Sequence, residues 1–186
     1  MAGSNYGTVE NCYSTANVSG RNAGGIVGVA QGSGKTEYCW ASGTVTGSNS
    51  GYSVGGIVGN KASTHAVNRC VKINGTITIP NGGASNIGRI WGTGTNVTSV
   101  NFAWDADSFG WSWNGYLEVT GGTKPTTPLP DPYNKHGRDT TATNLEQLTW
   151  WFGSSATEPG FSYTFWINDG TKRPHLSGFT GDYQPY

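Results

Sequence analysis

Apolar residues in the first half of the chain occur in small groups, separated by Gly, Asn, Ser and Thr. Examples are the pair Ile26 and Val27, the single Val45, and the pair Ile57 and Val58. The groups lack helical spacing, so the pattern predicts short β-strands joined by turns in which Gly and Asn supply positive φ. Strands this short cannot bury an apolar face alone, and we expect successive passages of the chain to pair.

The short strands belong to a repeat. The sequence Gly-Gly-Ile-Val-Gly at residues 24–28 recurs thirty-one positions later at residues 55–59, and in altered form at residues 88–92. Cys39 and Cys70 each lie eleven residues after the last Gly of the first two copies. A fixed period of this length is typical of a solenoid, in which each unit covers the next. We therefore predict an all-β fold, a right-handed β-solenoid with a core of Ile, Val and Cys.

Partial units extend the repeat at both ends. Cys12 stands in an earlier half-repeat, and residues 101–104 resemble one more Cys-containing strand in which Cys has become Asn. Lys72 interrupts the usual pattern after the third Cys, while Arg89 and Trp91 alter the third Gly-rich segment. We expect the last rung to be irregular for this reason.

The segments Gly-Gly-Ile-Val-Gly, Asn-Cys-Tyr-Ser and Gly-Thr-Val-Thr-Gly resemble the GLUG-motif repeats of large bacterial surface proteins and some secreted peptidases, over residues 3–104. Residues 144–176 are similar to the tail that often follows the last repeat. The resemblance implies a stalk or scaffold at a bacterial cell surface or outside the cell, without shared catalytic residues. We expect a piece of a longer protein, with β-solenoid repeats at residues 1–104 and an irregular, aromatic-rich C-terminal cap at residues 105–186.

The second half of the chain predicts a loop, a helix and a cap. Residues 121–138 are rich in Pro, Gly and Thr, which predicts a long surface loop. Thr143 and Glu146 have the spacing of a capping box, which predicts one short helix carrying the aromatic residues 150–152 as packing residues. We expect this helix and a strand at residues 165–167 to cover the end of the solenoid, where open strand edges would otherwise promote aggregation.

Charge and hydropathy exclude several classes of partner. Eleven basic and eleven acidic side chains balance, and no cluster of Lys or Arg occurs, so nucleic acid is not an expected partner. No apolar run approaches the roughly 18 residues of a transmembrane helix, and the first residues lack the pattern of a signal peptide. We expect any export signal to lie on a preceding part of the parent protein.

Residues 32–36, Gly-Ser-Gly-Lys-Thr, resemble the end of a phosphate-binding loop. Val29 stands where that motif requires an earlier Gly, and the residues that follow belong to a repeat strand, where the motif needs a helix. We interpret the segment as a turn between strands. No cofactor is expected.

The three cysteines occupy one equivalent position in successive units, so we expect them to stack along the core. An odd count argues against a complete disulfide framework, and the chain has no Cys/His set with metal-ligand spacing. We favour buried free thiols. His65, His136 and His175 show no positional relation to a Cys, which argues against a catalytic thiol.

Asp105 and Asp107 lie two residues apart, a spacing that can serve a calcium site or the acid/base pair of a β-helical polysaccharide enzyme. The alternative is a solvated turn after Trp104. We favour the turn, because no third acidic residue lies nearby to complete either site. No metal is expected.

The densest aromatic cluster is the candidate binding site. Its members are Trp104, Trp111, Trp113 and Tyr116. Alternation along a strand would place the rings of Trp111 and Trp113 on one side, and flat aromatic surfaces with polar neighbours bind sugar rings. The same rings would also suit packing of the cap onto the solenoid, which we favour over glycan contact.

Two classes of function follow. The preferred one is a non-enzymatic scaffold or adhesin-like module that presents loops or the aromatic cap to a surface glycan or a host protein. The alternative is a β-helical polysaccharide-acting or peptidase-associated enzyme module, which would need carboxylates converging on one face. The acidic positions do not recur with the repeat, so the enzyme comes second. A self-associating filament piece, joined end to end through the open edge of the first unit, is a third hypothesis.

Overall fold

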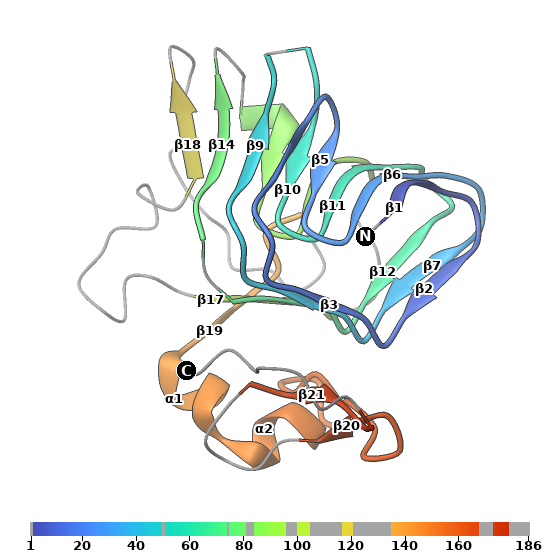
Figure 1. The fold of residues 1–186 in the computed structure, drawn as a ribbon, viewed down its shortest axis with the longest axis vertical. Helices are drawn as coiled ribbons and strands as arrows, with labels where there is room; N and C mark the ends of the chain where they lie inside the picture. The colour runs from blue at the N-terminus through green and yellow to red at the C-terminus, as the bar shows by residue number, and fades with distance from the viewer. Residues whose placement is uncertain are drawn as a thin grey trace.

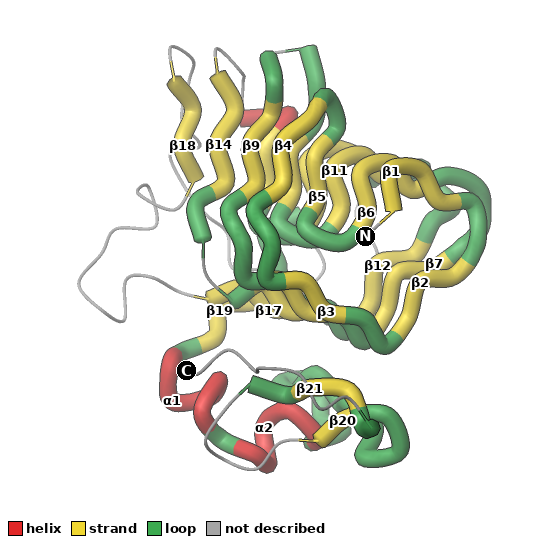
Figure 2. Tube along the Cα trace, in the orientation of Figure 1, coloured by secondary structure: helices red, strands yellow, loops and turns green. Residues whose placement is uncertain are grey.

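The computed structural model describes residues 2–49, 51–73, 75–80, 84–95, 100–104, 117–120, 135–167 and 173–178. These residues form mostly short β-strands, with two short α-helices and one 3₁₀ turn at Ala84–Asn86. The prediction of an all-β fold is confirmed. Figure 1 shows the strands stacked in parallel layers, and Figure 2 shows how loops and strands alternate along each passage of the chain.

The first three passages of the chain each contribute one strand to each of five parallel sheets, and the described part of the fourth passage contributes a strand to three of them. Sheet A contains β1 (Ala2–Asn5), β6 (Val27–Ala30), β11 (Val58–Lys61) and β16 (Trp91–Thr93). Sheet B contains β2 (Thr8–Glu10), β7 (Lys35–Glu37) and β12 (Ala66–Asn68). Sheet C contains β3 (Tyr13–Ser14), β8 (Trp40–Ala41), β13 (Val71–Lys72), β17 (Phe102–Trp104) and β19 (Arg138–Thr140). Sheet D contains β4 (Val18–Gly20), β9 (Val45–Gly47), β14 (Ile77–Pro80) and β18 (Leu117–Thr120). Sheet E contains β5 (Ala23–Gly24), β10 (Val54–Gly55) and β15 (Ile87–Gly88). Parallel ladders of this kind fit a β-helix.

The pairing follows the sequence repeat. In sheet A, Val27 pairs with Ala2 on one side and with Val58 on the other, and Val58 pairs with Trp91. Trp91 therefore takes the position of the repeat Val without breaking the ladder. The expected irregularity is absent from this segment, because β15 and β16 pair in register with β10 and β11.

Sheet C separates two apolar layers. Ala41 and Ala103 face the interior, where they join a core that includes Ile57 and Val58. Their neighbours Trp40 and Phe102 face the other way, into a second cluster. The alternation of side chains along a strand produces this division, since adjacent residues point to opposite faces.

The last rung is completed by residues 135–140. The backbone N–H of Ile90 donates to the carbonyl oxygen of Lys135, and β19 pairs with β17. The prediction that the surface loop extends to residue 138 is therefore wrong, because residues 135–138 hydrogen-bond to this rung. Residues 121–134 of that loop lie outside the described residues.

A C-terminal cover, defined as residues 141–167 and 173–178, lies along the outer face of sheet C (Figure 1). It contains α1 (Ala142–Glu146), α2 (Leu148–Phe152) and the antiparallel strands β20 (Trp166–Ile167) and β21 (His175–Leu176). The prediction that these residues close the end of the stack is wrong: their apolar side chains face sheet C.

The helices of the cover differ from the single helix that the sequence predicts. Two helices are present where one was predicted, because the chain is extended at Gln147 between them. The N-cap of α1 is Thr141, whose hydroxyl accepts a hydrogen bond from the backbone N–H of Asn144. Thr143 lies inside the helix, so it does not form the predicted capping box with Glu146.

Candidate functional site

The predicted aromatic platform falls almost entirely on residues that the structure does not describe. Trp111, Trp113 and Tyr116 lie outside the described residues, as do Asp105 and Asp107. Trp104 is the last residue of β17, where its backbone pairs with Thr140 of β19. The platform therefore remains a prediction, and Trp104 is its one member within the described residues.

The inner surface of the cover is an aromatic interface with sheet C. Trp150 packs edge-on against Phe102, with the ring centroids 5.3 Å apart, and Trp151 is fully buried beside it. The indole N–H of Trp40 donates to the carbonyl oxygen of Pro174 over 2.8 Å. These contacts confirm that Trp150 and Trp151 are packing residues.

The cover reaches the first passage of the chain as well as the last. The ring of Trp166 lies 6.2 Å from the ring of Tyr13, and its indole N–H donates to Oδ1 of Asn11. Arg69, in the next-but-one passage, donates to the carbonyl oxygens of Ser155 and Glu158. The cover thus ties three successive passages together across one side.

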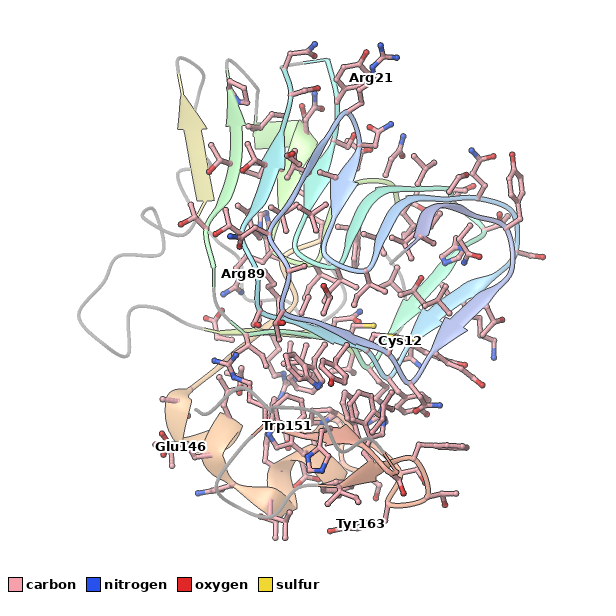
Figure 3. The ribbon with its side chains drawn as sticks, viewed as in Figure 1. Cys12, Arg21, Arg89, Glu146, Trp151 and Tyr163 are labelled. Atoms are coloured by element: carbon pink, nitrogen blue, oxygen red, sulfur yellow. The ribbon has the colours of Figure 1, made fainter. Side chains whose placement is uncertain are left out.

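The cover carries most of the exposed large apolar side chains among the described residues. They are Leu148, Tyr163, Phe165 and Ile167, while Tyr6 lies elsewhere. The ring of Tyr163, which is 65% exposed, stacks on Phe152 with centroids 3.9 Å apart and planes 7° apart. Figure 3 shows Tyr163 on the side of the cover that faces away from the sheets. Flat, stacked rings on a surface suit contact with sugar rings or with another apolar surface.

A lysine lies inside the stack. Lys72 is fully buried, and its ammonium group donates to the carbonyl oxygen of Gly43 over 2.6 Å. Burial, followed by the nearby charge of Arg173, lowers the pKa of Lys72 to about 7. Gly56 makes room for the side chain, because a Cβ there would lie 2.6 Å from Cγ of Lys72.

Two further buried ionisable side chains, Lys61 and His65, lie at the turn after β11. Lys61 is buried and donates to the carbonyl oxygens of Ala62 and His65, and its ammonium lies 5.8 Å from the ring centre of Trp91. The imidazole of His65 is within 3.1 Å of the hydroxyl of Thr36. Burial lowers the pKa of both Lys61 and His65. These groups satisfy buried backbone and side-chain atoms, which is a structural role.

The third buried cation, Arg89, closes the last rung. Its guanidinium donates to the carbonyl oxygens of His136 and Gly137 and to the carboxylate of Asp139. Burial lowers the pKa of His136 to about 3, so the imidazole is neutral at ordinary pH. Burial likewise lowers the pKa of Lys135 to about 8.

The three cysteines form a column of free thiols on the inner side of sheet C. Each follows a residue with positive φ, namely Asn11 at 51°, Tyr38 at 51° and Arg69 at 55°. The hydrogen bond with Cys39, followed by burial, raises the pKa of the Cys12 thiol. The hydrogen bond with Cys12 lowers the pKa of the Cys39 thiol, but the hydrogen bond with Cys70 and burial raise it by more, so this pKa also lies above the usual range.

The segment that resembles a phosphate loop is a turn followed by a strand. Gly32 has a φ of 65°. Lys35 is the first residue of β7, and its ammonium group forms a salt bridge with Glu37 of the same strand. The interpretation as a turn is confirmed. Within the described part of the chain, no three His, Cys, Asp or Glu side chains are grouped as a metal site would require. None of the described helices is both long and apolar enough to cross a membrane.

Comparison with known proteins does not place the chain in a family. No protein-family model, no curated protein and no solved structure matches it. The resemblance to GLUG-motif repeats therefore stays a prediction that rests on the residues quoted above.

Proposed function

We propose that the chain is part of a right-handed β-solenoid of the GLUG-repeat type and serves as a non-catalytic scaffold or adhesin-like module. We place it at a bacterial cell surface or outside the cell. The observation that carries the proposal is the continuous parallel pairing of successive passages, from Ala2 through Val27 and Val58 to Trp91. Such stacks give rigid, extended supports whose sides are available for binding.

The buried ionisable groups support a structural role. Lys72 binds a backbone carbonyl, Lys61 binds two carbonyls, and Arg89 binds two carbonyls and Asp139. Catalytic acids and bases instead converge on a cleft that a substrate can enter. These three cations are each engaged in holding the fold, which is the reason for proposing a module without catalysis.

The ligand class that we propose is a surface glycan. The sequence cluster of Trp104, Trp111, Trp113 and Tyr116 is the first candidate, and the exposed rings of Tyr163 and Phe165 on the cover are the second. Uncharged rings favour sugar stacking, and the zero net charge gives no preference for polyanions. The first cluster is our preferred site because its rings alternate with polar residues.

A glycan array with three proteins tests the proposal. The wild type is compared with Trp111→Ala/Trp113→Ala and with Tyr163→Ala/Phe165→Ala, which also removes two rings. Circular dichroism establishes beforehand that all three remain β-rich. We expect selective binding by the wild type, lost in the first variant and kept in the second.

Other outcomes lead elsewhere. Loss of binding only in the Tyr163→Ala/Phe165→Ala protein would move the site to the cover. Binding by none of the proteins would contradict the glycan proposal for the sugars tested. Shortening of an array glycan during incubation, followed by mass spectrometry, would contradict a non-catalytic role.

A further inference from the structure

His65 closes one corner of the stack from the inside. This corner, called the A–B corner, is defined as residues 31–36 and 61–66, where the chain turns from sheet A into sheet B in two successive passages. The side chain of His65 is buried there. Its ring Nδ1 lies 3.3 Å from the carbonyl oxygen of Gln31, and its ring Nε2 lies 3.1 Å from the hydroxyl of Thr36. One imidazole therefore joins the two passages at this corner.

The partners of the ring determine where its proton lies. A carbonyl oxygen only accepts hydrogen bonds, so Nδ1 of His65 carries the hydrogen and Nε2 accepts from the hydroxyl of Thr36. A second proton, on Nε2, would face the hydroxyl hydrogen of Thr36. That hydroxyl has no other hydrogen bond among the described residues, so its hydrogen would turn away and be left buried without an acceptor. The corner therefore fits the neutral imidazole.

The groups on the inner side of the corner also oppose a second proton on His65. The buried ammonium of Lys61 donates to the carbonyl oxygen of His65 itself and to that of Ala62. The other titratable group beside Thr36 is the thiol of Cys70, whose Sγ lies 3.4 Å from the carbonyl oxygen of Thr36. Burial lowers the pKa of His65 by more than the bond with Gln31 raises it, and the charge of Lys61 lowers this pKa further.

The carboxylates of the neighbouring strands face the other way. Glu37 follows Thr36 in β7, so its side chain points to the outer face, where it pairs with Lys35. Glu10 of β2 is paired with Glu37 in sheet B and belongs to the same outer column. The described strands of sheets A and B therefore place no carboxylate beside Lys61 that could balance a second buried cation.

We propose that the A–B corner is an acid-sensitive switch, which neutral His65 holds closed and protonation of His65 opens, while the strands of the other sheets stay paired. Opening brings the imidazole into water, where the charged ring is solvated and the repulsion from Lys61 is screened. The residues on either side of the ring, 31–36 and 61–66, then lose the contact that joins them across two passages.

The direction of the pH dependence follows from linkage. In the open corner His65 titrates near its ordinary pKa of about 6.5, whereas the pKa of the buried ring lies lower. The open form therefore binds more protons in the range between these values. The closed corner has its full stability above about pH 6.5 and loses stability as the pH falls through the pKa of the buried ring.

Hydrogen exchange of the whole chain tests the switch. Exchange is followed by mass spectrometry at about pH 7.5 and about pH 5, on either side of the ordinary pKa of His, and each rate is divided by the intrinsic rate at that pH. In the wild type, protection of residues 31–36 and 61–66 should fall at least about tenfold at the lower pH. Protection of sheet D should change by less than about threefold. His136, whose pKa is lowered to about 3, stays neutral at both pH values.

His65→Gln is the matched control, because its amide can donate to Gln31 and accept from Thr36 but takes up no proton. Protection of its corner should change by less than about threefold between the two pH values. Circular dichroism shows beforehand whether the variant is folded.

NMR titration of the His65 ring in the wild type decides the question even if the variant does not fold. The ring should become charged with a midpoint below about pH 6.5, over the same pH range in which the corner loses protection. Three results would overturn the proposal: a ring that becomes charged while the corner keeps its protection, an equal loss of protection in sheet D, or the same loss at the corner of His65→Gln.

Discussion

The guanidinium of Arg89 donates to the carboxylate of Asp139, fifty residues later in the chain, and to the carbonyl oxygens of His136 and Gly137 between them. Arg89 takes the place of the second Gly in the repeat, where Gly25 and Gly56 stand in the earlier copies. A side chain that would clash inside the earlier passages therefore becomes the contact that holds the returning segment onto the last rung.

Asp139→Asn tests this contact. Removing the carboxylate leaves the buried guanidinium without its charge partner, so we expect a loss of about 2 kcal/mol in the free energy of unfolding. Hydrogen exchange should rise first in residues 135–140. Glu37→Gln makes the same change in the pair with Lys35, whose cationic side chain is 54% exposed where that of Arg89 is buried, and should cost no more than about 1 kcal/mol. Equal effects in urea denaturation of the two variants would contradict the assignment.

Lys72 predicts a pH dependence of stability. Its pKa is lowered to about 7 in the folded state by burial and by Arg173, whereas an unfolded Lys titrates near about 10.4. The unfolded state therefore binds more protons between these values, and the free energy of unfolding rises with pH from about 7 upward. Over pH 7 to about 8.5, below the ordinary pKa of Cys, the slope for wild type should exceed that for Lys72→Met by roughly 1 kcal/mol per pH unit.

Comparing the slope of wild type with that of Lys72→Met cancels the contributions of the other ionisable groups, which both proteins contain. Lys135, whose pKa is lowered to about 8, contributes in the same direction but is present in both proteins. Chemical denaturation at four pH values in this window gives both slopes. Parallel slopes would show that the Lys72 ammonium is hydrated in the folded protein.

Gly56→Ala tests the close packing beside Lys72. An added Cβ would lie against the carbonyl oxygen of Arg89 and 2.6 Å from Cγ of Lys72, so the backbone or the Lys must move. We expect a loss of about 3 kcal/mol or more in urea denaturation. Gly20→Ala in β4 is the matched control, since a Cβ there meets nothing within 4 Å. Similar midpoints for the two variants would contradict this packing.

Trp40→Phe tests how the cover is held. The substitution keeps an aromatic ring against Tyr13 but removes the indole N–H that donates to the carbonyl oxygen of Pro174. We expect a loss of about 1 kcal/mol in the free energy of unfolding. Amides of residues 173–178 should exchange faster while those of sheet D keep their protection. Unchanged exchange in residues 173–178 would mean that this bond does not hold β21.

The sequence predicts the stacked part of the fold well because the repeat records it directly. Recurring Gly and Cys positions predict which strands pair, and the interpretation of residues 101–104 as a Cys-strand with Asn is confirmed by the pairing of Val71 with Phe102. Asn101 bonds the backbone N–H of Cys70 and the carbonyl oxygen of Val67, a role open to its amide. Local pattern is sufficient here since each unit repeats its neighbour.

The position of the cover could not be predicted in the same way. Trp166 and Asn11 are separated by most of the chain, and no period links them. Outward aromatic residues in sheet C, such as Tyr13 and Trp40, were the available signal, because large rings facing away from the core of the stack need a second surface to cover them. The interior position of Lys72 was hidden for a similar reason, since it depends on the missing Cβ of Gly56 in another passage.

The contact of Trp166 with the first passage offers the most direct test that the C-terminal segment covers the side of the stack. In a solution NMR spectrum, the indole N–H proton of Trp166 should show nuclear Overhauser effects to side-chain protons of Asn11 and Tyr13. Effects from this proton to residues of the last rung alone, such as Arg138, would place the segment over the end of the stack and contradict the account.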